Sequence, residues 1–213
     1  ELNPNYTKAY NNLGVALQRQ GDLTGAIASC NRAVKIAPDS SAGHYNLGNA
    51  LLENGNLTKA IKSYNCSLKI QPGLAVAHSN LGIALQDSGN LPEAIESFKR
   101  ALKITPDFIS ALAHKINQQS FICDWDSIET DRDLIPDLGV LTDFIDPLPL
   151  MALEDHPGRH LKRSSSFAKH KCMVNSGELP AIAPPAQNPD RLKIGYFSGV
   201  FHEHPVMHLI VNM

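Results

Sequence analysis

The apolar and polar residues in the first half of the chain recur with a period of 34 positions. Leucine with glycine, then alanine, then proline return at that step: Leu13–Gly14, Leu47–Gly48 and Leu81–Gly82; Ala26, Ala60 and Ala94; Pro4, Pro38, Pro72 and Pro106. Within one period, Tyr10, Leu13 and Leu17 share one face of a helix, which predicts that they pack inward. The pattern predicts helix pairs at 7–20 and 23–36, 41–54 and 57–70, and 75–88 and 91–104, then a seventh helix at 109–121.

Glycine and proline mark the ends of these helices. Gly21, Gly55 and Gly89 each lie between the two helices of a pair, where a C-cap needs positive φ. The prolines follow the second helix of each pair because proline cannot continue a helix. Gly14 lies on the packed face of its helix, where the lack of a side chain lets the second helix approach closely.

A helix pair repeated every 34 residues is typical of the tetratricopeptide repeat (TPR), whose pairs stack into a right-handed superhelix. The fold is therefore expected to be mainly α. We predict three TPR repeats over 1–106, with the tail of a preceding repeat at the start, and a capping helix over 107–121. That helix has Lys115 and Ile116 where the repeats have leucine and glycine.

The second half of the chain has a different pattern. A helical connector is expected over 122–179, with a helix at 157–170, followed by a proline-rich linker over 180–190. The apolar run Leu192–Phe197 predicts the first strand of an α/β sheet, so that 191–213 forms a short α/β stub. In open α/β sheets ligands bind beyond the carboxyl ends of strands, where the loop 198–205 lies.

Composition narrows the possible partners and the compartment. The net charge is −2 and no basic stripe is present, so nucleic acid is not an expected partner. No run approaches the roughly 18 apolar residues of a membrane span. The four cysteines show no pairing motif, and we predict reduced thiols and a cytoplasmic location: Cys30, Cys66, Cys123 and Cys172.

The charges of the connector are segregated. Residues 124–155 carry ten acids and one base, Arg132, whereas 156–171 carry five bases and no acid. Neighbouring helices could dock through these charges, or the charges could simply form solvated faces.

Asparagine recurs on the face that the superhelix turns inward. Asn12, Asn46 and Asn80 share one phase of the first helix, directly before the packed leucine. Because an amide both donates and accepts hydrogen bonds, this ladder could hold the backbone of an extended peptide without reading its sequence. The alternative is that the amides tie neighbouring helices together. We predict a protein or peptide partner in this groove.

Histidines gather near the end of the chain, at His202, His204 and His208. Their spacing could ligate zinc, but no carboxylate or cysteine partner is evident and a break from loop to helix separates them, so no metal site is predicted.

Three segments resemble the O-linked N-acetylglucosamine (O-GlcNAc) transferases and their bacterial SPINDLY-like relatives. They are the Asn-Leu-Gly ladder, Thr-Pro-Asp-Phe at 105–108 with Ile-Cys-Asp-Trp-Asp at 122–126, and Arg-Leu-Lys-Ile-Gly-Tyr-Phe-Ser-Gly-Val-Phe-His-Glu-His-Pro-Val-Met-His-Leu at 191–209. The last segment is similar to the opening strand and loop of the family's first catalytic lobe. It departs from the family pattern at Val200, where aspartate is usual.

The resemblance implies a bacterial glycosyltransferase that moves a sugar from a nucleotide donor of the UDP-GlcNAc type to a protein serine or threonine. It implies that His204 is the active-site histidine, acting as a general base or positioning substrate. Alternatively, His204 only caps a helix or packs the loop.

The resemblance also implies that the chain is a fragment, because the family builds most of its nucleotide site from a second lobe. We therefore expect no catalysis and no bound cofactor in this chain, and self-association through its exposed repeat face. The other class of function is a non-enzymatic TPR adaptor that assembles other proteins.

Overall fold

The computed structural model of the protein describes residues 4–140, 150 and 153–172. All of these belong to the first of two units, Glu1–Asn175. The second unit, Ser176–Met213, lies outside the described residues, and so do the predicted strand, the α/β stub and the linker. In the described residues every regular element is a helix, which confirms the mainly α expectation for that part of the chain.

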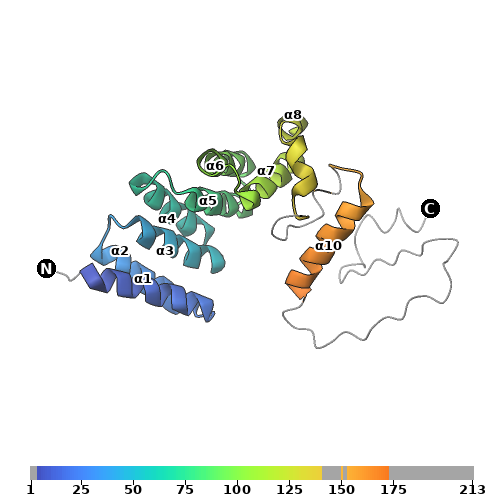
Figure 1. Cartoon of the computed structure of the whole chain (residues 1–213). Helices are drawn as coiled ribbons and strands as arrows, with labels where there is room; N and C mark the ends of the chain where they lie inside the picture. Colours follow the sequence, from blue (N-terminus) through green and yellow to red (C-terminus); the bar gives the residue numbers. More distant parts are fainter. Residues whose placement is uncertain (1–3, 141–149, 151–152, 173–213) are drawn as a thin grey trace, which may run out of the picture. The chain divides into compact units, whose positions relative to one another are not determined.

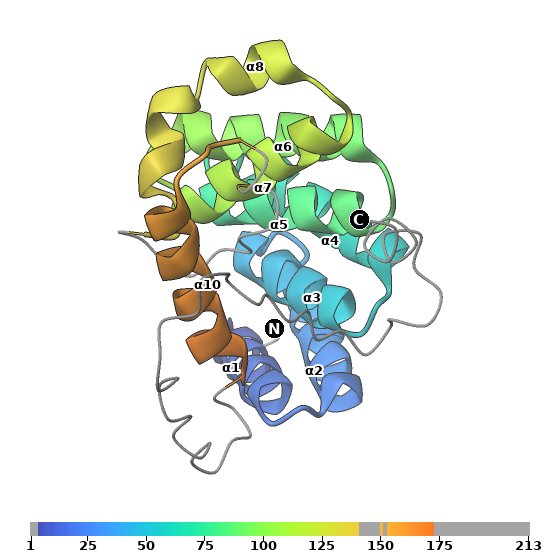
Figure 2. The same ribbon diagram turned by 90° about the vertical axis from the view of Figure 1, so that its right-hand side faces the viewer.

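Three pairs of helices and a seventh helix follow one another along the repeats. They are α1 (Pro4–Arg19) and α2 (Leu23–Ile36), α3 (Ser41–Glu53) and α4 (Leu57–Ile70), α5 (Ala75–Asp87) and α6 (Leu91–Ile104), and α7 (Ile109–Phe121). Figures 1 and 2 show the partners of each pair lying side by side and the pairs following one another in chain order. The predicted bounds agree with these helices to within three residues at either end.

The turn inside each pair has the same geometry in all three repeats. Gly21, Gly55 and Gly89 have φ of 83°, 74° and 82°, as predicted for a glycine C-cap. In the first turn the N–H of Asp22 donates to the carbonyl of Leu17, closing the last turn of α1. The Asp22 carboxylate then accepts from the N–H of Gly25 and caps the start of α2.

Small residues bring the two helices of each pair together. Ala26, Ala60 and Ala94 are fully buried. A methyl group at Gly48 would lie 2.6 Å from the ring of Tyr64, and one at Gly82 would lie 2.6 Å from the ring of Phe98. Both distances are too short for a real side chain, so each glycine is required by a close approach, as predicted.

One residue that was predicted to pack inward is exposed. Leu47 and Leu81 are each 7% exposed, but Leu13 at the same phase is 47% exposed, so the prediction that Leu13 packs inward is wrong. The reason is that α2 packs against the following first helix, α3, and α4 packs against α5. Within the described residues no helix takes that position before α1.

The connector begins as an altered fourth helix pair. Cys123 takes the phase of the turn glycines and has φ of 58°, and the N–H of Asp124 donates to the carbonyl of Gln119 as in the repeats. Two short helices follow, α8 (Trp125–Glu129) and the 3₁₀ helix η1 (Arg132–Asp137). The turn of the repeat is therefore retained, while its second helix is cut to little more than one turn.

Lys115 and Ile116 explain how this segment docks on α7. Ile116 is fully buried in a second apolar cluster: Leu112, Ile116, Ile128, Ile135, Leu138 and Leu150. Lys115 is 8% exposed, and its ammonium lies 2.6 Å from the carboxylate of Asp131. Ile116 and Lys115 thus replace the packing of a full second helix with an apolar cluster and an ion pair.

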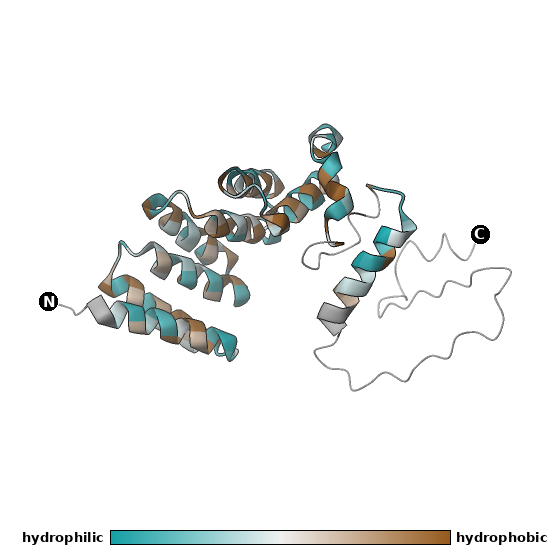
Figure 3. Ribbon diagram, viewed as in Figure 1, coloured by the Kyte–Doolittle hydropathy of each residue, from teal (hydrophilic) through white to brown (hydrophobic). Residues whose placement is uncertain are grey.

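The last described helix, α10 (Pro157–Cys172), is held by a buried arginine. It is mostly hydrophilic, whereas each repeat helix carries apolar patches (Figure 3). The Arg163 side chain is fully buried, and its guanidinium donates to the carbonyls of Leu138 and Ile135, each at 2.7 Å. It also pairs with Glu154, to which Arg159 donates at 2.9 Å. The acidic and basic segments of the connector therefore do interact, through the ion pairs of Glu154 with Arg159 and Arg163.

We predict that Lys115→Ala destabilises the connector by about 3 kcal/mol, because the change leaves the Asp131 carboxylate buried without its counter-ion. Urea unfolding followed by the fluorescence of Trp125 measures this, since Trp125 is the only tryptophan and lies in α8.

Arg100→Ala is the control, because the Arg100–Glu96 pair is exposed and its loss is expected to change stability little. Equal unfolding midpoints for Lys115→Ala and Arg100→Ala would contradict the role given to the buried pair. The double variant Lys115→Leu with Asp131→Leu should recover most of the loss, because no buried charge remains.

Candidate functional site

The first helices of the repeats form one side of the stacked pairs. α1, α3, α5 and α7 contact one another in chain order, besides contacting their own partners. Asn12, Asn46 and Asn80 lie on α1, α3 and α5, at equivalent positions of this inner layer. Their surroundings differ, because Asn12 is exposed whereas Asn46 and Asn80 are half-buried.

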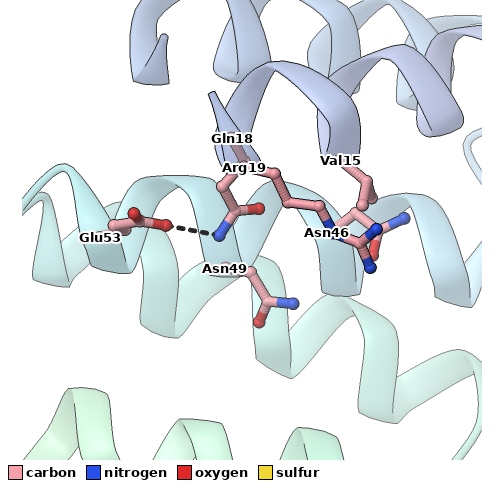
Figure 4. Close-up of a pocket in the computed structure, with 6 residues that line it drawn as sticks. All are labelled: Val15, Gln18, Arg19, Asn46, Asn49 and Glu53. Carbon is pink, nitrogen blue, oxygen red and sulfur yellow. Dashed lines mark hydrogen bonds between the residues drawn. The ribbon is translucent and has the colours of Figure 1, made fainter. Parts of the chain in front are cut away.

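A pocket of about 420 Å³ lies between α1 and α3. Its lining is mostly polar and comes from these two helices: Val15, Gln18, Arg19, Asn46, Asn49 and Glu53 (Figure 4). The volume is within the range of sites that bind small molecules. Of the three ladder asparagines, Asn46 is the one that lines this pocket.

Asn49 is a pocket residue that the ladder pattern did not reveal. Its Oδ1 accepts a hydrogen bond from the Tyr64 hydroxyl at 2.8 Å and another from Nδ2 of Asn80 at 2.9 Å. Nδ2 of Asn80 also donates to the Tyr45 hydroxyl at 3.2 Å. Asn80 therefore ties α5 to α3. The available signal was the spacing of three from Asn46 to Asn49, which places both on one helix face.

Donors outnumber free acceptors in the α1–α3 pocket. Nε2 of Gln18 donates to Oε2 of Glu53 at 2.6 Å, which occupies one oxygen of the only carboxylate in the lining. Arg19 is the only cation of the lining, and in Figure 4 its guanidinium extends toward Asn46. The side-chain chemistry of the pocket therefore suits a ligand that accepts hydrogen bonds.

His114 occupies the phase of the ladder asparagines on α7. Its ring stacks on Phe98 with centroids 5.4 Å apart, and Nδ1 lies 3.2 Å from Oε1 of Gln86. Burial lowers the pKa of His114, and the nearby carboxylate of Asp87 opposes this only in part. The neutral ring is thus favoured in the folded protein.

This pKa shift makes stability depend on pH. Below about pH 6.5 the unfolded chain protonates His114, while the folded chain resists protonation until a lower pH. We therefore expect the free energy of unfolding to fall as the pH decreases through this window.

The variant His114→Asn, which carries the residue that the repeats have at this phase, should lose less stability between pH 7.5 and 5.5 in urea titrations. An identical loss in the two proteins would assign the pH dependence to other groups.

The other predicted sites are placed as follows. His202, His204 and His208 lie outside the described residues, and so does Val200. Cys30, Cys66 and Cys123 are free thiols. Among the residues that the structure describes, no three His, Cys, Asp or Glu side chains come close enough to hold a metal ion. No helix of the described part is both long and apolar enough to cross a membrane.

A tetratricopeptide-repeat family model matches residues 5–72 and 39–107. These residues are therefore TPR repeats, in agreement with the helix pairs, the turn glycines and the buried alanines described above. No curated protein matches the chain.

Solved structures with similar folds include two that are 26% identical to this chain. YrrB, a TPR protein with an unusual peptide-binding site, has a TM-score of 0.50 over 51% of this chain and 56% of its own. A mutant O-GlcNAc transferase of Thermobaculum terrenum has a TM-score of 0.52 over 70% of this chain and 25% of its own. The chain thus spans about half of the first protein and a quarter of the second.

A more distant structure has the same fold. The first TPR domain of Spaghetti, bound to an HSP90 peptide, is 17% identical, with a TM-score of 0.56 over 57% of this chain and 96% of its own.

Proposed function

We propose that the repeats bind an extended segment of a partner protein along the inner layer of α1, α3, α5 and α7. The observation that carries this proposal is the α1–α3 pocket, which is lined by the amides of Asn46 and Asn49 and by the Arg19 guanidinium. A peptide in extended conformation presents a carbonyl on each side about every 6–7 Å, so amides spaced along a row of helices can bind its backbone.

Two features of this layer favour a peptide over a small metabolite. The polar positions recur from helix to helix, from Asn12 on α1 to His114 on α7, so the surface continues beyond one pocket. YrrB and Spaghetti, which share the fold, are described with a peptide-binding site and a bound peptide, respectively.

The test is selection of binding peptides of about fifteen residues, long enough to span roughly 50 Å, from a random phage library. Replacing Asn12, Asn46 and Asn80 together with alanine is expected to weaken binding of a selected peptide at least about tenfold, since each lost hydrogen bond contributes around 1 kcal/mol. Fluorescence anisotropy of the labelled peptide measures the change.

Asn65→Ala is the matched control, because Asn65 is exposed on α4, a second helix of its pair. Unchanged affinity of the triple variant, or failure to select any peptide, would contradict the proposal. Melting temperatures separate the alternatives: a large loss of stability with Asn80→Ala alone would favour amides that tie helices together.

We further propose that the chain is part of a glycosyltransferase of the O-GlcNAc transferase type. The likeness to the Thermobaculum enzyme supports this, because it covers 70% of this chain and so must extend beyond the TPR match, which ends at residue 107. The sequence at 191–209, which resembles the opening of the catalytic lobe, supports it independently. A non-enzymatic adaptor is the alternative.

Protein expressed from the natural gene tests the enzymatic proposal. We expect it to transfer GlcNAc from UDP-GlcNAc to partner proteins, as detected by mass spectrometry, and His204→Ala to lower transfer by roughly 10²–10⁴-fold if His204 is a general base. Peptide binding should hardly change. Wild-type protein without transferase activity would favour the adaptor, and full activity of His204→Ala would assign His204 to loop packing.

The 213 residues alone are expected to have no affinity for a uridine-diphosphate sugar, because 198–205 offers no glycine-rich cradle and no lysine for a pyrophosphate. Calorimetry that detects specific binding of UDP-GlcNAc would contradict this.

A further inference from the structure

The second repeat differs from its neighbours at two positions that face each other. Opposite the packed glycine of the first helix, the three repeats have Cys30, Tyr64 and Phe98. One residue after that glycine they have Val15, Asn49 and Ile83, respectively. A hydroxyl and an amide thus occur together in the second repeat, whereas both positions are free of hydroxyl and amide groups in the other two.

Gly48 allows the hydroxyl to reach the inner layer. The Tyr64 side chain comes from α4, is fully buried, and lies directly against the backbone of α3 at Gly48. Its hydroxyl reaches past Gly48 and donates to Oδ1 of Asn49, the next residue of α3. Burial raises the pKa of Tyr64, so the hydroxyl stays protonated and remains a donor at neutral pH.

Two donors on one oxygen fix the orientation of the Asn49 amide. Oδ1 accepts from Tyr64 and from Asn80, so the amide nitrogen must turn the other way. In Figure 4 this nitrogen lies on the side of Asn46 and Arg19. Because Asn49 lines the α1–α3 pocket, its NH₂ group is held in place as a donor at this pocket before any ligand arrives.

We infer that Asn49 is a preorganised donor for a backbone carbonyl of the bound peptide, and that Tyr64 is the positioning residue that holds it. The inference rests on the proposed peptide binding and assigns the second repeat as the polar anchor of the groove. Preorganisation matters because an amide free to rotate loses conformational entropy on binding, which a fixed amide does not.

Tyr64→Phe tests the positioning role with little risk of misfolding, because the third repeat already has a phenylalanine, Phe98, over its glycine. With the selected peptide as probe, we expect Tyr64→Phe to weaken binding about three- to tenfold, and Asn49→Ile, which copies Ile83, to weaken it further. In the Asn49→Ile background Tyr64→Phe should have no additional effect, because the amide that it positions is gone.

Asn49→Asp tests the direction of the hydrogen bond. A carboxylate can still accept from Tyr64 and Asn80, but it presents an oxygen to the pocket where the amide presents NH₂. Binding should fall at least as far as with Asn49→Ile. The side-chain amide signals of Asn49 in ¹H–¹⁵N spectra should shift on addition of the peptide to the wild-type protein, and should already be altered by Tyr64→Phe without peptide.

The outcomes separate this inference from the proposed function. Wild-type protein that selects no peptide overturns both. Three other outcomes would each overturn the inference alone. The first is peptide binding that needs the ladder asparagines but is unchanged by Tyr64→Phe. The others are additive effects of Tyr64→Phe and Asn49→Ile, and tight binding by Asn49→Asp.

Discussion

The contact between a glycine on the first helix and the side chain opposite it sets the spacing of the two helices in each repeat. At Gly48 and Gly82 an aromatic ring lies where a β-carbon would otherwise be, so the helices approach until ring and backbone touch. The fully buried alanines on the second helix complete this close packing. Because the pairs are built alike, each new pair presents its neighbour with a similar surface, and stacking buries what one pair cannot bury alone.

The same contact explains why the stack changes after the third pair. Ile116 stands at the glycine position of α7, so a ring could not lie against the backbone there. The chain instead keeps the turn, at Cys123, and packs the short helices α8 and η1 over Ile116. Lys115 replaces the packed leucine and binds Asp131. A left-handed conformation is unfavourable for a non-glycine residue, which indicates that the surrounding packing determines the turn at Cys123.

Features that depend on neighbours in sequence could be predicted, and features that depend on neighbours in space often could not. Helix bounds and the positive φ of Gly21, Gly55 and Gly89 follow from residues within a few positions of each turn. The exposure of Leu13 depends on whether another helix lies outside α1, which its own repeat does not encode. The pairing of Lys115 with Asp131 likewise required the path of the connector.

The candidate site illustrates this limit most clearly. A search for recurring residues finds Asn12, Asn46 and Asn80 but passes over Asn49, because its equivalents are Val15 and Ile83. Recurrence also suggests one role for all three ladder positions, yet the partners of an amide depend on the neighbouring repeat as much as on its own.

Asn80 directs its NH₂ group back to α3, because Asn49 and Tyr45 offer oxygens there. One repeat earlier, the residue equivalent to Asn80 is Asn46, which lines the pocket with α1. On α1, Val15 occupies the position equivalent to Asn49 and offers no acceptor. The two hypotheses for the ladder, a groove for peptides and ties between helices, can therefore hold for different asparagines of one row. In this arrangement the hydrogen bond from Asn80 fixes the amide of Asn49, and Asn49 in turn lines the α1–α3 pocket.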